Sequence, residues 1–168
     1  MPERHRMSGK SEDLLLVRDA FQHCLEIVKT DFLGDQRHTW GPQAGFVLLM
    51  ICMSDMLRAL DREGMRVGFT DHVPEGFDIS DQIYKMRNAV CHFGSSHRDL
   101  RRGGKVVFCI LGHNPGGTGI DLGDYEMSNP FEDDWAIYYG ELCLFLKRHI
   151  YRVMDEVGAV LEKEFPAR

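Results

Sequence analysis

The 168-residue chain has no excess of positive charge and no long hydrophobic run. Its 26 acidic residues outnumber its 20 lysines and arginines, which gives a formal net charge of −6. Proteins that coat nucleic acid non-specifically need a broad basic surface, so this balance argues against that class but does not exclude one local basic site. The longest strongly apolar run, FVLLMICM at 46–53, is far shorter than the roughly 20 residues that span a bilayer. We therefore expect a soluble protein.

Cysteine is scarce, and the cysteines are scattered. The sequence has five, at positions 24, 52, 91, 109 and 143, and no CxxC pair. An odd number of isolated cysteines, three of them inside apolar stretches, indicates reduced thiols that pack as small hydrophobes. The first ten residues are charged and lack the apolar segment of a signal peptide. These features predict a cytoplasmic protein.

Internal repeats and low-complexity segments are also missing. A chain of this length with 43% hydrophobic and 27% charged residues has the composition of one globular domain. We expect a flexible N-terminus over 1–10 and a single folded domain over 11–168.

Hydrophobic residues recur at three- and four-residue steps through the first half of the sequence, a spacing typical of helices. The first predicted helix begins at Ser11 and stops at Gly34, and the second begins near Pro42 and stops at Gly64. The second is apolar on nearly all sides, so we expect it to be the central, most buried helix. A third helix is predicted from about 78–80 to Gly94.

The second half changes its pattern at residue 105. KVVFCILG at 105–112 is β-branched and apolar, and a glycine-rich turn follows, so we predict a β-hairpin over 105–122. A long final helix is then expected to about Lys163, with Pro130 near its start and Asp133 and Asp134 in its first turn. The predicted fold class is all-α: an antiparallel bundle of four main helices with a small β-hairpin inserted before the last helix.

The stretch KMRNAVCHFGSSHR at 85–98 carries the most informative polar residues. Asn88 and His92 are four residues apart and should be neighbours on one face of the third helix. Arg87 lies about 140° round the helix from His92, but its long side chain can reach toward the helix end. This combination predicts a site for a phosphate group.

The surrounding segment is locally basic. Between 85 and 105 there are six lysines and arginines and one acid, Asp99. The planar fork of arginine matches phosphate oxygens. The candidate substrate-binding residues are His97, Arg98, Arg101, Arg102 and Lys105. An exposed loop without a ligand remains the alternative for 98–105, as does a solvent-exposed histidine for His97.

The order of Arg87, Asn88 and His92 at the end of a helix resembles the HEPN superfamily, whose RNase members carry an R-x4–6-H motif with a polar residue after the arginine. RNAVCH matches the R-x4-H form. Outside these six residues the likeness is one of architecture only. The resemblance implies a homodimer in which two motifs face each other across one cleft.

The resemblance also implies RNA cleavage without a metal or cofactor. His92 would act as general base or acid, and Arg87 would stabilise charge on the phosphoryl oxygens. Asn88 would orient the histidine or the phosphate by hydrogen bonding. Asp55 is the candidate supporting partner of Arg87. By this resemblance the protein would be a toxin or phage-defence component with RNA as substrate and a cognate antitoxin as a further partner.

Two other functions stay open at this point. The first is a non-catalytic HEPN-type dimerisation module that binds a nucleotide or a protein. The second is a structural bundle, which predicts that Arg87 pairs with Asp55 or another acid and that His92 caps carbonyl groups. A zinc site is not expected, because the cysteines and histidines between 91 and 113 match no finger or knuckle spacing.

Overall fold

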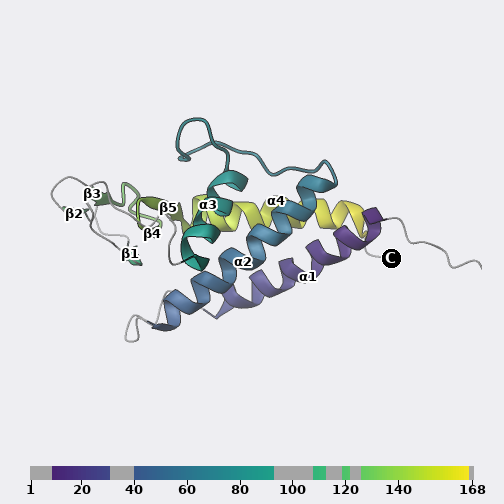
Figure 1. Ribbon diagram of the computed structural model, residues 1–168, viewed down its shortest axis with the longest axis horizontal. Coiled ribbons are helices and arrows are strands. Elements are labelled where there is room, and N and C mark those ends of the chain that lie inside the picture. Colours follow the sequence, from purple (N-terminus) through teal and green to yellow (C-terminus); the bar gives the residue numbers. More distant parts are fainter. Residues whose placement is uncertain (1–8, 31–39, 93–107, 113–118, 122–125, 167–168) are drawn as a thin grey trace, which may run out of the picture.

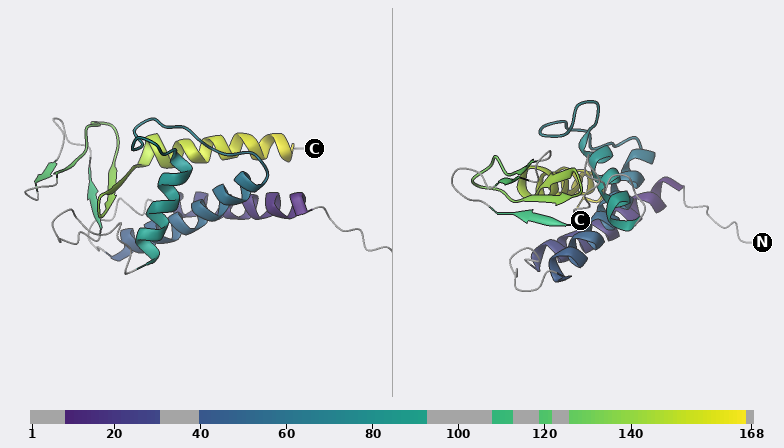
Figure 2. Two further views of the ribbon diagram at one scale, coloured as in Figure 1. Left: turned by 45° about the horizontal axis from the view of Figure 1, so that its top comes forward. Right: turned by 60° about the vertical axis from the view of Figure 1, so that its left-hand side comes forward.

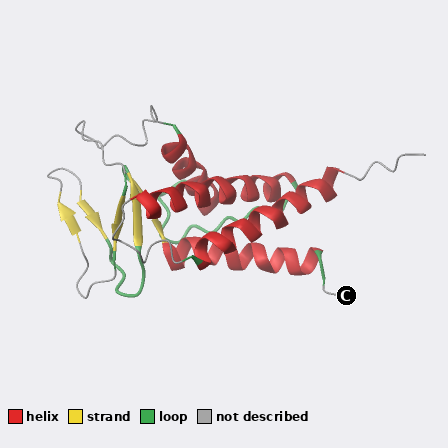
Figure 3. Cartoon of the chain, turned by 90° about the horizontal axis from the view of Figure 1, so that it is seen from below, coloured by secondary structure: helices red, strands yellow, loops and turns green. Residues whose placement is uncertain are grey.

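The computed structural model describes residues 9–30, 40–92, 108–112, 119–121 and 126–166. Three long helices run along the molecule, a shorter one crosses them, and short strands gather at one end (Figures 1 and 3). The helices are α1 (Gly9–Lys29), α2 (Trp40–Arg62), α3 (Ile79–Cys91), the π-helix η2 (Leu146–Tyr151) and α4 (Arg152–Glu164). The strands are β1 (Cys109–Leu111), β2 (Gly119–Asp121), β3 (Glu126–Ser128), β4 (Ala136–Tyr139) and β5 (Leu142–Phe145).

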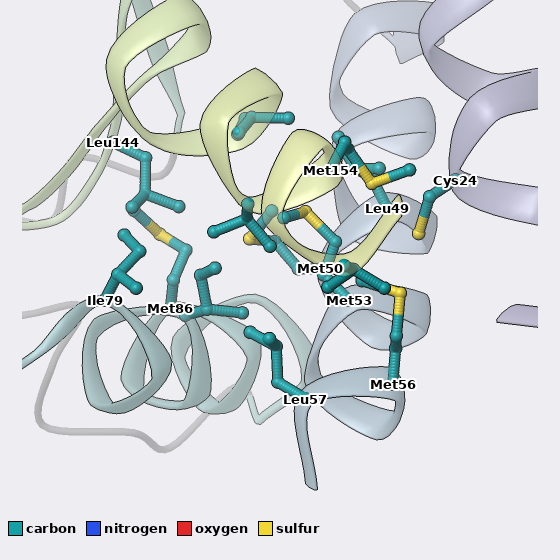
Figure 4. Close-up of a cluster of buried hydrophobic side chains, with 14 of the residues drawn as sticks. Cys24, Leu49, Met50, Met53, Met56, Leu57, Ile79, Met86, Leu144 and Met154 are labelled. Carbon is teal, nitrogen blue, oxygen red and sulfur yellow. The ribbon is translucent and has the colours of Figure 1, made fainter. Parts of the chain in front are cut away.

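Helix α2 is the centre of the core, as its apolar sequence predicts. Six of its side chains have no exposed surface: Phe46, Leu49, Met50, Met53, Met56 and Leu60. The methionines of α2 lie among Cys24 of α1, Met86 of α3 and Met154 of α4 (Figure 4). One helix therefore supplies the apolar surface on which the other helices pack, and unbranched methionine side chains adapt to the gaps between them.

By length and composition, α2 also has a segment, Gly41–Arg62, that is apolar enough to cross a membrane. Half of its most apolar window is buried inside the protein. Core helices of soluble proteins have the same composition, because their apolar side chains face other helices rather than lipid. The structure is therefore compatible with a soluble protein.

Helix α3 begins where the sequence predicts. Asp78 is its N-cap, and a capping box joins Asp78 and Asp81: the backbone N–H of Asp81 donates to Asp78 Oδ1 over 2.9 Å. The helix is held against the sheet by Gln82, whose side-chain amide donates to the carbonyl oxygen of Cys143 in β5. His92 leaves the helix with φ −114° and ψ 107°, two residues before the predicted stop at Gly94. The capping box thus fixes the start of α3, and the helix ends at Cys91.

The prediction of an all-α bundle with one inserted hairpin is wrong. The described residues contain two small antiparallel sheets, one with strand order β1-β4-β5 and one in which β2 pairs with β3. The predicted hairpin over 105–122 does not form between its own strands: Ile110 of β1 pairs with Ile137 of β4, and Ile120 of β2 pairs with Met127 of β3. The glycine-rich turn predicts that the segments on its two sides pair with each other. Instead, each segment pairs with a strand further along the chain.

The prediction that the final helix begins near Pro130 is also wrong. Residues 136–145 form a hairpin of β4 and β5 in which Tyr139 pairs with Leu142 across the two-residue turn Gly140-Glu141. Gly140 has φ +61°, a value that glycine adopts readily and that tight hairpin turns require. Short apolar runs buried on both faces, such as AIYY, are compatible with helical and strand periodicity alike. The helix begins only at Leu146, as η2, and continues into α4 (Figure 2).

Candidate functional site

The predicted phosphate site lies at the C-terminal end of α3. Arg87 Nη1 donates a hydrogen bond to Asn88 Oδ1 over 3.3 Å and lies 3.5 Å from His92 Nε2. The backbone N–H of His92 donates to the carbonyl oxygen of Asn88 over 3.0 Å. The structure therefore brings Arg87, Asn88 and His92 together, although helical geometry places Arg87 about 140° from His92.

Arg87 and His92 contact each other at the end of α3. A guanidinium group has only donors, so a hydrogen bond from Arg87 would use the lone pair of His92 Nε2. The His92 side chain is exposed at the helix end and Arg87 is half-buried. The guanidinium of Arg87 and the imidazole of His92 thus lie beside each other at the end of α3.

Within the described parts of the chain, no carboxylate forms an ion pair with Arg87. Four other arginines there do bind carboxylates, among them Arg66 with Asp78 over 2.7 Å and Arg152 with Asp71 over 2.8 Å. None of the described acids therefore neutralises the charge of Arg87.

Asp55, the predicted partner of Arg87, lies elsewhere. It is exposed on α2 and lines a groove of about 450 Å³ between α1 and α2, together with His23 and Arg58. No ion pair joins Asp55 to Arg87. The contact that a purely structural role for Arg87 predicted with this acid is therefore not formed.

The predicted substrate-binding residues of the basic segment, His97, Arg98, Arg101, Arg102 and Lys105, lie outside the described residues. Their placement relative to His92 stays a prediction of the sequence.

Two residues near the site were missed by the sequence analysis. Tyr84 lies on the same face of α3 as Asn88 and His92, at successive four-residue steps. The guanidinium carbon of Arg58, from α2, lies 4.1 Å from the centre of the Tyr84 ring. Hydrogen bonding with Asn88 lowers the pKa of the Tyr84 hydroxyl, and hydrogen bonding with Arg58 lowers it further by a smaller amount. The four-residue spacing of 84, 88 and 92 could have indicated Tyr84 from the sequence. No sequence pattern indicates Arg58, because it lies on another helix.

A second histidine, His149 in η2, has a structural role. It is completely buried; its Nδ1 accepts the backbone N–H of Phe145 over 3.2 Å, and its Nε2–H donates to the carbonyl oxygen of Asp71 over 3.1 Å. Burial lowers the pKa of His149 below its ordinary value. Both ring nitrogens are occupied, so His149 fastens the 64–78 segment to η2 and is not available to a substrate.

Metal ligands are not gathered at this site. Among the described residues, no group of three or more histidine, cysteine, aspartate or glutamate side chains is arranged to hold a metal ion.

Comparison with known proteins adds no family assignment: no protein-family model matches the chain, and neither a curated protein nor a solved structure matches it.

Proposed function

We propose that this protein is a metal-independent RNA endonuclease in which Arg87, Asn88 and His92 form the active site. The observation that carries the proposal is the 3.5 Å approach of Arg87 Nη1 to Nε2 of His92 in an exposed position. The resemblance of RNAVCH to the R-x4-H motif of HEPN ribonucleases supports the same chemistry.

In this reaction His92 Nε2 accepts the proton of a ribose 2′-hydroxyl. The 2′-oxygen then forms a bond to the adjacent phosphorus, and the bond between phosphorus and the 5′-oxygen breaks. Arg87 donates hydrogen bonds to the phosphoryl oxygens as their charge increases. Asn88 accepts a hydrogen bond from Arg87 and so holds the guanidinium in place. The products are a 2′,3′-cyclic phosphate and a 5′-hydroxyl.

The departing 5′-oxygen needs a proton, and the His92 that acts as the base in this step cannot act as the acid in the same step. A homodimer solves this requirement if the partner's His92 is protonated and donates to the leaving oxygen. We therefore propose that two copies of this chain share one cleft. By the same resemblance, the setting is cytoplasmic, and the protein acts as a toxin or defence component with a cognate antitoxin.

The test is cleavage of single-stranded RNA by the purified protein in EDTA, beside Arg87→Ala and His92→Ala proteins. Each variant should lose roughly 100-fold or more in rate, since a positioned acid or base contributes about 10²–10⁴-fold. His23→Ala is the matched control, because His23 lies in the groove between α1 and α2. An oligonucleotide without 2′-hydroxyls should not be cut.

Circular dichroism establishes that each variant is folded, and sedimentation measures the oligomeric state. A parent protein that is dimeric but inert on varied RNAs would overturn the enzymatic proposal in favour of a binding or dimerisation module. Retention of cleavage by His92→Ala would overturn the assigned base.

A further inference from the structure

Two of the five cysteines lie next to each other across the helices α1 and α2. Arg62 near the end of α2 binds Asp13 near the start of α1, with 3.1 Å between Arg62 Nε and Asp13 Oδ2, so the two helices are antiparallel. Following both helices inward from this ion pair brings Cys24 and Cys52 to the same level. The two thiols form a hydrogen bond with each other. Two sulfur atoms from distant parts of the chain are therefore in contact.

The cysteines of the sheet have no such contact. Cys109 of β1 pairs with Tyr138 of β4, and Tyr138 pairs with Cys143 of β5, so a whole strand separates the two cysteines. Neighbouring strands are about 4.8 Å apart, which places the two Cα atoms roughly 10 Å apart. A disulfide requires Cα atoms within about 7 Å of each other. Cys109 and Cys143 therefore cannot form a disulfide while β4 lies between them.

Cys24 and Cys52 differ in their access to solvent. Cys24 is completely buried in the core, whereas Cys52 is half-buried and lines the groove of about 450 Å³ between α1 and α2. A small oxidant that enters this groove meets Cys52 first. Burial raises the pKa of both thiols, and the carboxylate of Asp55 raises that of Cys52 further. Because the thiolate is the reactive form, oxidation should be slow at neutral pH and faster as the pH rises.

We propose that Cys24 and Cys52 form a modification site, at which a hydroperoxide produces a disulfide between α1 and α2. In the first step the Cys52 thiolate attacks hydrogen peroxide: an S–O bond forms, the O–O bond breaks, and the leaving hydroxide takes up a proton to become water. In the second step the Cys24 sulfur attacks the sulfenic acid of Cys52: the S–S bond forms, the S–O bond breaks, and a second water leaves. Two thiols and one hydrogen peroxide give one disulfide and two waters. This site is independent of the proposed RNA cleavage.

The disulfide changes the stability of the helix pair. It joins residues 24 and 52 in the unfolded chain and so removes conformational freedom from that state. For a protein of this size we expect the melting temperature to rise by at least about 5 °C. A disulfide in a reducing compartment is usually transient, so the modification would form under oxidising conditions and be reversed by thiols.

The experiment uses the Cys91→Ser protein, in which the exposed thiol can neither consume the oxidant nor join two molecules. The protein is treated with hydrogen peroxide at pH 7 and at pH 9, free thiols are alkylated, and the protein is digested without reductant. Mass spectrometry should find one pair of peptides joined through Cys24 and Cys52, formed faster at pH 9. Dithiothreitol should separate the two peptides and return the melting temperature to its starting value.

Variants separate the two steps. Cys52→Ala should leave Cys24 as a free thiol, because the peroxide does not reach it. Cys24→Ala should stop at the sulfenic acid of Cys52, which dimedone traps. Cys109→Ala is the matched control, since Cys109 is also half-buried with a pKa raised by burial, and it should form the disulfide as the parent does.

Three results would overturn the proposal. They are a disulfide between other cysteines, oxidation of Cys52 to its sulfinic acid while Cys24 stays a free thiol, and two unreacted thiols at both pH values. An unchanged melting temperature in the cross-linked protein would overturn the stabilising effect. Circular dichroism checks that the variants are folded; if Cys24→Ala is not, Cys52→Ala carries the test, because its side chain is only half-buried.

Discussion

The buried carboxylate of Asp134 binds Arg148 twice, through the backbone N–H over 3.0 Å and through the guanidinium Nη1 over 3.1 Å. It also accepts the backbone N–H of Lys147 over 2.8 Å. Asp134 thus satisfies N–H groups at the start of η2 from a position before β4, with the whole β4–β5 hairpin between. The sequence predicts Asp134 in the first turn of a helix. In the structure it stabilises the start of η2, which begins twelve residues after it.

We predict that Asp134→Ala destabilises the protein by roughly 3 kcal/mol, because it leaves the backbone N–H groups of Trp135, Lys147 and Arg148 without their buried acceptor and removes one carboxylate from Arg148. Asp133→Ala is the matched control. Asp133 binds the same arginine over 2.8 Å but is largely exposed, so its loss should destabilise the protein far less than the loss of Asp134. Urea unfolding followed by circular dichroism measures both. Equal effects of the two substitutions would contradict the capping role of Asp134.

Stability should depend on pH through His149. Its pKa is lowered in the folded protein, so the unfolded chain binds a proton that the folded chain does not. The contribution of His149 is therefore complete above the unfolded value of about 6.5 and is lost as the pH falls below it toward the folded pKa. One such proton corresponds to a slope of up to about 1.4 kcal/mol per pH unit. Unfolding free energies at pH 7.5, 6.5 and 5.5 measure it.

The matched variants are His149→Gln, which keeps a hydrogen-bonding amide but does not titrate, and His23→Gln on the exposed face of α1. His149→Gln should be less stable at pH 7.5 and show a shallower decline toward pH 5.5, whereas His23→Gln should follow the parent. An unchanged slope in His149→Gln would show that another group is responsible.

Thiol reactivity should single out Cys91. It is the exposed cysteine beside His92, whereas burial raises the pKa of Cys143 to about 12 and also raises that of Cys24. A maleimide added to the native protein should modify Cys91 first, as mass spectrometry of the digested protein would show. A bulky adduct there should block access to His92 and reduce RNA cleavage. Cys91→Ser, cleaving normally and resisting the reagent, is the control; faster labelling at Cys24 would contradict the structure.

Tyr84→Phe separates the two contacts of this residue. The phenyl ring keeps its contact with the Arg58 guanidinium, but the hydroxyl that hydrogen-bonds with Asn88 is lost. We expect RNA cleavage to fall about tenfold, the value of roughly one hydrogen bond to a positioning group, with oligonucleotide binding unchanged. Kinetics at saturating RNA measure the cleavage rate, and the fluorescence anisotropy of a 2′-O-methyl RNA oligonucleotide measures binding. A loss of binding with unchanged cleavage at saturation would contradict this prediction.

Much of the helical part could be predicted because its signals are local. The cap at Asp78 and the apolar spacing of α2 depend on residues within a turn or two of each other. The neighbourhood of Asn88 and His92 follows from the same four-residue geometry. These features depend only on residues that are close together in the sequence.

Only the tertiary structure determined which strands pair and that Arg58 contacts Tyr84. Ile110 pairs with Ile137, more than twenty residues away, and no turn between them specifies that partner. AIYY becomes a strand because Gly140 permits a tight turn and both faces of β4 are buried, a condition that periodicity does not report. Arg58 reaches Tyr84 because α2 and α3 pack together. The sequence by itself determined the first three helices and the Arg87–His92 motif through short-range geometry, whereas strand pairing, the start of the last helix and the approach of Arg58 to Tyr84 required contacts that only packing creates.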